Sequence, residues 1–186
     1  MAKLIYATPT SLDGYIAGEN ENLDWSAPDE EGFAFISDLL RPIGTYLYGR
    51  EMYQTMAVWD TPDVIPGLTP AMRDFARVWQ AADKIVYSKS LETVSTRKTR
   101  IVREFDPQMV CDLKARLPQD LTVGGPTLAA HVIRAGLVDE YHLFVAPAIL
   151  GGGKPVLPGK VRLTLKLLDE RRFGNGMVYL RYHAGS

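Results

Sequence analysis

Three segments, far apart in the chain, combine glycine, hydroxyl and basic residues in ways that could hold phosphate groups. In the first, the apolar run 121–123 leads into Gly124 and Gly125, and Pro126 follows. Glycine lets the backbone approach a ligand closely, and proline is favoured in the first turn of a helix. Because a helix N-terminus presents unpaired N–H groups and a partial positive charge, this order of residues predicts an anion site.

In the second segment, Arg50 follows Gly49 at the expected start of a helix. The helix dipole disfavours a cation there, and a bound phosphate, to which arginine donates paired hydrogen bonds, would remove the conflict. In the third, Ser88 and Lys89 directly follow the apolar run 84–87, where hydroxyl and ammonium groups suit a phosphate. The alternatives are a surface arginine paired with a nearby carboxylate, and an ordinary polar loop.

Two carboxylates are candidates for handling a proton. Asp13 precedes Gly14 in a turn after the first expected strand, and ligands of open α/β sheets bind at the carboxyl ends of strands. The alternative for Asp13 is a plain turn. Glu30 opens an expected helix near Trp25 and Phe33, and a carboxyl group half-buried beside these rings would have a raised pKa. The alternative for Glu30 is an acidic first turn that the helix dipole stabilises.

Composition narrows the possible functions. The 186 residues include 21 basic and 22 acidic residues, so the net charge of -1 gives no reason to expect a nucleic acid or an anionic membrane as partner. The single cysteine excludes an internal disulfide, and the three histidines lack metal-ligand spacing, so we expect no metal site. We recognise no signal region and no apolar run of the roughly 20 residues that span a membrane, and we expect a cytoplasmic protein.

The elements that must position these segments alternate along the first three quarters of the chain. Apolar runs and helical spacing predict strands at 3–8, 15–17, 45–48, 84–87, 100–102, 121–123 and 138–146, and helices at 30–40, 51–58, 70–80, 106–117 and 127–135. Two more strands, 163–172 and 177–183, flank the hairpin signal Asn175-Gly176. This pattern predicts one α/β domain over residues 1–186, with a mostly parallel sheet, helices on both faces and a C-terminal antiparallel hairpin.

The chain resembles the RibD C-terminal domain family, the reductase domain of bifunctional riboflavin-biosynthesis deaminase–reductases, which has the dihydrofolate reductase fold. The resemblance covers about residues 3–183. It rests on the order of five segments: SLDGYIA (11–17), YGREMY (48–53), VYSKS (86–90), VGGPTL (123–128) and LVDEYHLFVAPAILGGGKP (137–155). We identify no deaminase domain, so the chain resembles a stand-alone member. The resemblance and the apolar strand 141–146 also suggest a homodimer.

The resemblance implies that NADPH lies across the carboxyl edge of the sheet. It also implies a cis peptide bond between the paired glycines, as in dihydrofolate reductases. The implied contacts are Gly49, Arg50 and Met52 near the adenosine ribose phosphate, Ser88 and Lys89 at the 2′-phosphate, Gly124, Gly125, Pro126, Thr127 and Leu128 at the pyrophosphate, and Ile16 and Ala17 at the nicotinamide.

On the substrate side the resemblance points to two different acids. In riboflavin reductases the aspartate of SLDG is at the reacting centre, which nominates Asp13. Dihydrofolate reductases carry a W-x-x-P-x-[DE] pattern, which Trp25 to Glu30 fit, and this nominates Glu30. We therefore expect an NADPH-dependent reductase that delivers hydride to a C=N or C=O bond of a pteridine- or pyrimidine-like substrate, with Trp25 and Phe33 stacked on its ring. The alternatives are a true dihydrofolate reductase, an NADPH-binding sensor or assembly protein without turnover, and a flavin or deazaflavin in the same cleft.

Overall fold

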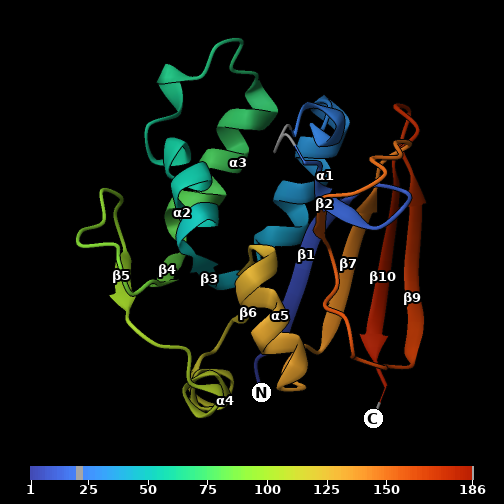
Figure 1. Cartoon of the computed structure of the whole chain (residues 1–186). Helices are drawn as coiled ribbons and strands as arrows, with labels where there is room; N and C mark the ends of the chain where they lie inside the picture. Colours follow the sequence, from blue (N-terminus) through green and yellow to red (C-terminus); the bar gives the residue numbers. More distant parts are fainter. Residues whose placement is uncertain (20–22, 186) are drawn as a thin grey trace.

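A single large sheet organises the molecule (Figure 1). In the computed structural model, which describes residues 1–19 and 23–185, eight strands form this sheet in the order β5-β4-β3-β6-β1-β7-β10-β9. These strands are β1 (Leu4–Thr10), β3 (Ile43–Gly49), β4 (Asp83–Tyr87), β5 (Thr99–Val102), β6 (Asp120–Gly124), β7 (Glu140–Val145), β9 (Leu165–Arg172) and β10 (Val178–Ala184). A separate two-stranded ribbon pairs β2 (Tyr15–Ala17) with β8 (Lys154–Pro155).

The strand directions confirm the predicted architecture. Neighbouring strands from β5 to β7 are parallel, whereas β10 is antiparallel to both β7 and β9. The final hairpin turns at Asn175-Gly176, where Gly176 has a φ of +89° and the Phe173 N–H donates to the Met177 carbonyl oxygen over 2.9 Å. A positive φ is readily reached by glycine, which explains the residue type at this turn.

Helices cover both faces of the parallel part of the sheet. They are α1 (Glu30–Leu40), α2 (Arg50–Met56), α3 (Pro70–Ala81), α4 (Pro107–Arg116) and α5 (Pro126–Arg134), with short 3-10 helices η1 (Asp24–Ser26), η2 (Ala57–Asp60) and η3 (Pro62–Val64). Residues of α4 and α5 pack with Leu4 and Tyr6 of β1 on one face, and residues of α1, α2 and α3 pack with Ile5 on the other. Because the parallel strands are buried on both faces, they read as nearly continuous apolar runs in the sequence.

The helix starts follow from capping side chains. Thr69 accepts a hydrogen bond from the Met72 N–H, and Asp106 accepts one from the Gln108 N–H, as their positions before Pro70 and Pro107 predict. None of the helices in the described part of the chain is both long and apolar enough to cross a bilayer. Over the same residues, no three His, Cys, Asp or Glu side chains gather as metal ligands would.

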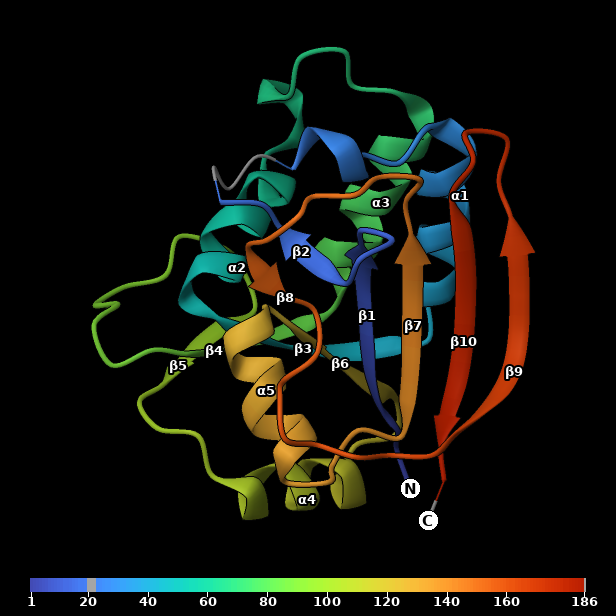
Figure 2. The same cartoon turned by 45° about the vertical axis from the view of Figure 1, so that its right-hand side comes forward.

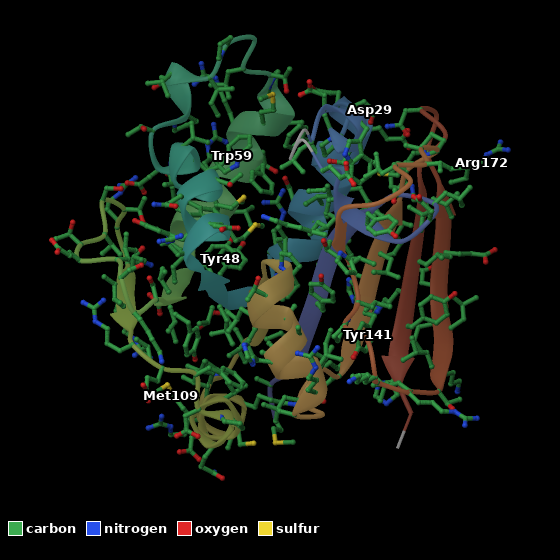
Figure 3. The ribbon with its side chains drawn as sticks, viewed as in Figure 1. Asp29, Tyr48, Trp59, Met109, Tyr141 and Arg172 are labelled. Atoms are coloured by element: carbon green, nitrogen blue, oxygen red, sulfur yellow. The ribbon has the colours of Figure 1, made fainter. Side chains whose placement is uncertain are left out.

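Two stacked tyrosines on β3 differ in whether their hydroxyl groups have partners. Tyr46 and Tyr48 are buried, and their ring centroids lie 5.6 Å apart. The Tyr48 hydroxyl accepts a hydrogen bond of 3.1 Å from the Trp79 indole N–H. Figure 3 shows Tyr48 inside the molecule, whereas Arg172 on β9 points outward. The Tyr46 hydroxyl has no hydrogen-bond partner among the described residues.

We expect Tyr46→Phe to raise the free energy of unfolding by about 1 kcal/mol, because it removes an unpaired buried hydroxyl and keeps the ring. Tyr48→Phe is the matched control. It leaves the Trp79 N–H unpaired, and we expect it to lower the free energy of unfolding by about 1–3 kcal/mol. Urea denaturation followed by tryptophan fluorescence measures both values. A Tyr46→Phe variant less stable than the wild type would contradict the prediction.

A charged network lies beneath the antiparallel part of the sheet. The Glu140 side chain is 2% exposed and accepts hydrogen bonds from Lys3 Nζ (2.7 Å), Arg181 Nε (2.8 Å) and His142 Nε2 (3.0 Å). The Tyr179 hydroxyl lies 3.1 Å from His142 Nδ1. Since Nε2–H donates to the carboxylate, Nδ1 is the acceptor of the Tyr179 proton. Burial lowers the pKa of His142, which keeps the ring uncharged near neutral pH.

One face of β7, β10 and β9 has no helix over it in the described structure (Figure 2). The strand register pairs Leu143 with Leu180 and Val145 with Val178, and all four side chains are partly exposed. Leu167 of β9, paired with Tyr182, is also exposed. We refer to Leu143, Val145, Leu167, Val178 and Leu180 as the open sheet face.

Candidate functional site

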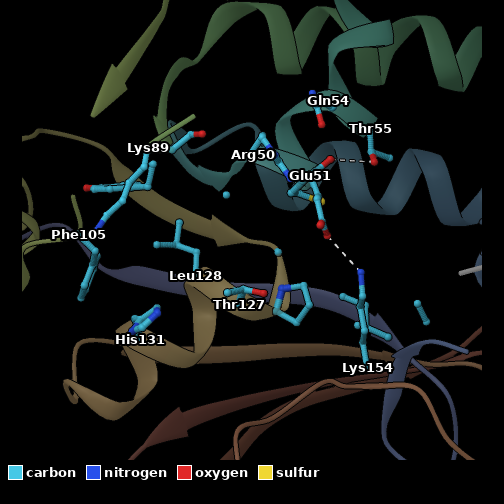
Figure 4. Close-up of a pocket in the computed structure, with 18 of the residues that line it drawn as sticks. Arg50, Glu51, Gln54, Thr55, Lys89, Phe105, Thr127, Leu128, His131 and Lys154 are labelled. Atoms are coloured by element: carbon cyan, nitrogen blue, oxygen red, sulfur yellow. Dashed lines mark hydrogen bonds and ion pairs between the residues drawn. The ribbon is translucent and has the colours of Figure 1, made fainter. Parts of the chain in front are cut away.

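A groove of about 870 Å³ opens at the carboxyl edge of the parallel strands (Figure 4). The elements around it are the start of α2, the segments that follow β4 and β5, the start of α5, and the β2–β8 ribbon. Strands β3, β4 and β6 are adjacent and parallel, so the residues that follow them meet at one edge of the sheet. This edge is where ligands of open α/β sheets bind.

The predicted cofactor residues converge on this groove. Its lining includes Ile16, Ala17, Gly49, Arg50, Met52, Ser88, Lys89, Gly125, Pro126, Thr127 and Leu128. Gly124 is the exception, because it is buried below the groove. A Cβ at Gly124 would lie 2.8 Å from Tyr48 Cε1, so packing of β6 against β3 requires a glycine there. The other residues of the three segments thus share one groove, and cofactor binding in it stays a prediction.

The start of α5 presents backbone N–H groups that no side chain of the described residues caps. Gly125 is the N-cap residue, without a side-chain hydrogen bond, and the first turn of α5 carries no acidic residue. The first N–H bonded back within the helix is that of Ala129, which donates to the Gly125 carbonyl oxygen. Thr127 and Leu128 precede it and both line the groove, so this end of α5 suits an anion.

The expected cis bond between Gly124 and Gly125 is wrong. The described residues contain no cis peptide bond. The chain turns from β6 into α5 through Gly125, whose φ of +92° is open to glycine and strained for other residues.

Basic side chains outnumber acidic ones in the groove. Its lining includes Arg50, Lys89, Arg103 and Lys154 against Glu51 and Glu104. Arg50 Nη1 donates to Ser90 Oγ over 3.0 Å, and Lys89 Nζ lies 3.5 Å from Glu104 Oε1. The net positive lining would favour an anionic ligand.

Among the groove residues that the sequence analysis missed is Arg103. Arg97 and Lys98 lie in the same basic stretch of the sequence, but Arg97 pairs with Asp60 and Lys98 donates to the Ala81 carbonyl oxygen, and neither lines the groove. Arg103 directly follows β5 and donates to the Ser88 carbonyl oxygen over 3.2 Å. Its place after a parallel strand is the signal that could have identified it.

Other lining residues were not named as contacts in the sequence analysis, although Glu51, Tyr87 and Lys154 lie in the segments that carry the family resemblance. Phe105 and His131 face each other at one end of the groove, with ring centroids 5.9 Å apart. Lys154 lies at the other end, beside Ile16 and Ala17 in the lining, and its Nζ is 3.1 Å from Glu51 Oε2. The members that were missed altogether are Leu23, Glu51, Gln54, Thr55, Tyr87, Arg103, Glu104, Phe105, His131 and Lys154.

Asp13 holds a loop in place. Its carboxylate accepts hydrogen bonds from Ser11 Oγ (2.6 Å), the Leu150 N–H (3.1 Å) and the Gly151 N–H (2.7 Å). The bond from Ser11, helped by the two backbone N–H groups, keeps the pKa of Asp13 below its usual value. Asp13 is exposed and does not line the groove described above. This carboxylate therefore ties the turn after β1 to the glycine-rich segment after β7.

The expectation of a half-buried Glu30 is wrong. Glu30 is exposed and accepts a hydrogen bond of 3.1 Å from the Ala71 N–H at the start of α3, where the helix dipole favours a carboxylate. Phe33 packs edge-on against Trp59 and Phe75, whereas Trp25 belongs to a different apolar cluster below α1. The structure thus does not bring the two nominated aromatic rings together.

The sheet order, the closing hairpin and the groove at the carboxyl edge define an α/β protein with the fold of riboflavin-biosynthesis reductases. The model of the RibD C-terminal domain matches residues 2–179, and the chain belongs to this family. It is 29% identical to the uncharacterized protein YyaP of Bacillus subtilis (strain 168), over 97% of this chain and 94% of that protein. It is 26% identical to the uncharacterized protein YwjB of the same organism, over 97% of each.

Solved structures share the fold. A Shewanella sp. PV-4 protein provisionally assigned to riboflavin biosynthesis aligns with a TM-score of 0.75 and 21% identity over 100% of both chains. A pyrimidine reductase-like protein from Corynebacterium diphtheriae aligns with a TM-score of 0.69 and 15% identity, over 100% of this chain and 92% of that one. The deaminase/5-amino-6-(5-phosphoribosylamino)uracil reductase of Thermotoga maritima aligns with a TM-score of 0.67 and 15% identity, and 57% of that chain is covered.

Proposed function

We propose that this chain is an NADPH-dependent reductase that transfers a hydride to a C=N or C=O bond of a pteridine- or pyrimidine-like substrate. The observation that carries the proposal is the convergence of the Gly125–α5 turn, Arg50, Ser88 and Lys89 on one groove. Membership of the RibD C-terminal domain family supports the same reaction class, because two relatives of this fold are named as a pyrimidine reductase-like protein and a uracil reductase.

The residues that line the groove fit a dinucleotide that carries a 2′-phosphate. The uncapped start of α5, with Thr127 and Leu128, would hold the diphosphate. Arg50, Lys89 and Arg103 gather at the segments after β3, β4 and β5 and would hold a 2′-phosphate. Bound NADPH supplies the hydride, while the protein supplies orientation and electrostatics.

The remaining residues exclude water and position the reacting groups. Ile16, Ala17 and Leu23 form the apolar end of the groove, which suits a nicotinamide ring. Asp13, our first candidate for the reacting centre, accepts hydrogen bonds from Leu150 and Gly151 and so ties the turn that precedes Ile16 and Ala17 to the glycine-rich segment. Glu30 is our second candidate for proton handling. Substitution of each carboxylate by its amide in a steady-state assay would separate these two roles.

Calorimetric titration with NADPH and NADH tests the proposal. We expect NADPH to bind more tightly, because only NADPH carries the 2′-phosphate that the basic end of the groove would recognise. A spectrophotometric assay then follows NADPH oxidation with pteridine and pyrimidine substrates, dihydrofolate included. Equal binding of the two nucleotides would overturn the cofactor assignment. Tight NADPH binding without turnover on any substrate would favour a sensor or assembly protein instead.

We also propose that two copies of the chain pair through the open sheet face, because apolar side chains there lack a covering helix. Light scattering after size-exclusion chromatography should give the mass of two chains for the wild type. Leu180→Glu should give one chain, because it would bury a charge in the interface. Val64→Glu, at an exposed apolar residue of η3, is the control and should leave the dimer intact. A monomeric wild type would refute the pairing.

A further inference from the structure

One ion pair spans the groove between elements that are distant in the sequence. Lys154 Nζ of β8 lies 3.1 Å from Glu51 Oε2, in the first turn of α2. Both residues line the groove together with Thr127, which lies in the first turn of α5, and Figure 4 draws the ion pair as a dashed line. A dinucleotide that runs from Ile16 to Lys89 along the groove must pass this pair.

The backbone fixes the position of Lys154. The β2–β8 register places Lys154 opposite Ala17, and the Val156 N–H donates to the Gly14 carbonyl oxygen over 2.9 Å. A Cβ at Gly153 would lie 2.0 Å from the Ala17 carbonyl oxygen, so only glycine allows β8 to approach β2 this closely. The glycine-rich segment before Lys154 therefore brings an ammonium group to the groove wall.

The ion pair between Lys154 and Glu51 is easily exchanged. The side chains of Lys154 and Glu51 are 42% and 71% exposed, and ion pairs in water contribute little to stability. A diphosphate beside the uncapped N–H groups of α5 offers more negative charge than one carboxylate, and charge-assisted hydrogen bonds to phosphate are strong. Lys154 would therefore exchange Glu51 for such a ligand.

We infer that Lys154 is a diphosphate-binding residue, which Glu51 holds while the groove is empty and releases when the cofactor binds. The inference rests on the proposed function. Glu51 would act as a competing anion. Its carboxylate pairs with the Lys154 ammonium group before the cofactor binds and repels the diphosphate afterwards. The two residues together would therefore set the affinity of the groove for the cofactor.

Calorimetry with NADPH at low ionic strength tests this assignment on four proteins: the wild type, Lys154→Met, Glu51→Gln and the double variant. We expect Lys154→Met to weaken NADPH binding about 10- to 100-fold, the effect of one lost charge-assisted hydrogen bond. We expect Glu51→Gln to tighten it about threefold to fivefold. In the double variant the gain from Glu51→Gln should shrink, because coupled residues are not additive.

Two controls separate a diphosphate contact from a general effect of charge. Lys166→Met removes an exposed lysine on β9, outside the groove, and should leave NADPH binding unchanged. Adenosine 2′-monophosphate lacks a diphosphate, so its binding should not respond to Lys154→Met. Circular dichroism and the midpoint of urea unfolding show that each variant folds.

Each outcome is decisive. NADPH binding that is insensitive to Lys154→Met, or equally weakened by Lys166→Met, would overturn the inference and leave the proposed function standing. Equal losses for NADPH and adenosine 2′-monophosphate would also overturn it, because the contact would then lie at the adenosine end. A wild-type protein that binds no NADPH would overturn the proposed function and the inference together.

Discussion

Arg50→Ala is expected to weaken NADPH binding about 10- to 100-fold and to change NADH binding little. Arg50 lines the groove at the start of α2, and one of its guanidinium nitrogens donates to Ser90 Oγ over 3.0 Å. The guanidinium group has further N–H donors, which suit a phosphate. One lost charge-assisted hydrogen bond corresponds to roughly 1.5–3 kcal/mol. Parallel calorimetric titrations with the two nucleotides measure the difference.

Two further variants locate the source of this selectivity. Arg73→Ala removes an exposed arginine of α3 that pairs with Asp63 outside the groove, so it should affect neither nucleotide. Ser90→Ala removes the partner that orients Arg50 and should give a smaller, NADPH-selective loss. If Arg50→Ala weakened both nucleotides equally, Arg50 would contact a part that they share rather than the 2′-phosphate.

Glu140→Gln should lower the free energy of unfolding by about 3 kcal/mol, the lower end of the range for breaking a buried ion pair. The substitution removes the negative charge to which Lys3, Arg181 and His142 donate hydrogen bonds. The expected loss is at the low end because Lys3 and Arg181 are partly exposed and can recover some hydration. Urea denaturation at neutral pH measures the loss. Glu170→Gln, at an exposed carboxylate of β9, is the control and should have an effect near zero. A loss of similar size in both variants would contradict the role of the network.

The same carboxylate predicts an acid-dependent loss of stability. Burial alone would raise the pKa of Glu140, but the hydrogen bonds from Arg181, Lys3 and His142 outweigh it and lower the pKa from 4.5 to about 2. A group with a lower pKa in the folded protein stabilises fully above its unfolded pKa and loses this effect as the pH falls. We therefore expect the free energy of unfolding to fall between about pH 4.5 and pH 2, and Glu140→Gln to show a shallower fall.

Features that depend on neighbouring residues can be predicted from the sequence. Thr69 and Asp106 cap helices because a short side chain reaches an N–H two or three residues ahead, and Asn175-Gly176 turns a hairpin for equally local reasons. The groove could also be predicted, since residues that follow adjacent parallel strands must meet at one edge of the sheet.

Features that depend on contacts between distant residues could not be predicted in this way. Glu30 opens α1 as expected, but the start of α3 beside it supplies an N–H group and leaves the carboxylate exposed. Lys154 reaches the groove only because β8 pairs with β2, a pairing of five residues in all that gives no periodic signal. The Glu140 network gathers residues from two strands, β7 and β10, and from the N-terminal segment, so no single window of the sequence contains it.

The position of β1 in the middle of the sheet has a consequence for biosynthesis. Its partners are β6 and β7, so Leu4 pairs with Leu121, and Ile5 pairs with Glu140. A nascent chain that has left the ribosome only as far as residue 119 holds neither strand that flanks β1, although β1 was translated first. The apolar strand β1 therefore stays unpaired during most of translation, when chaperones could shield it. Long-range parallel pairing of this kind also folds slowly.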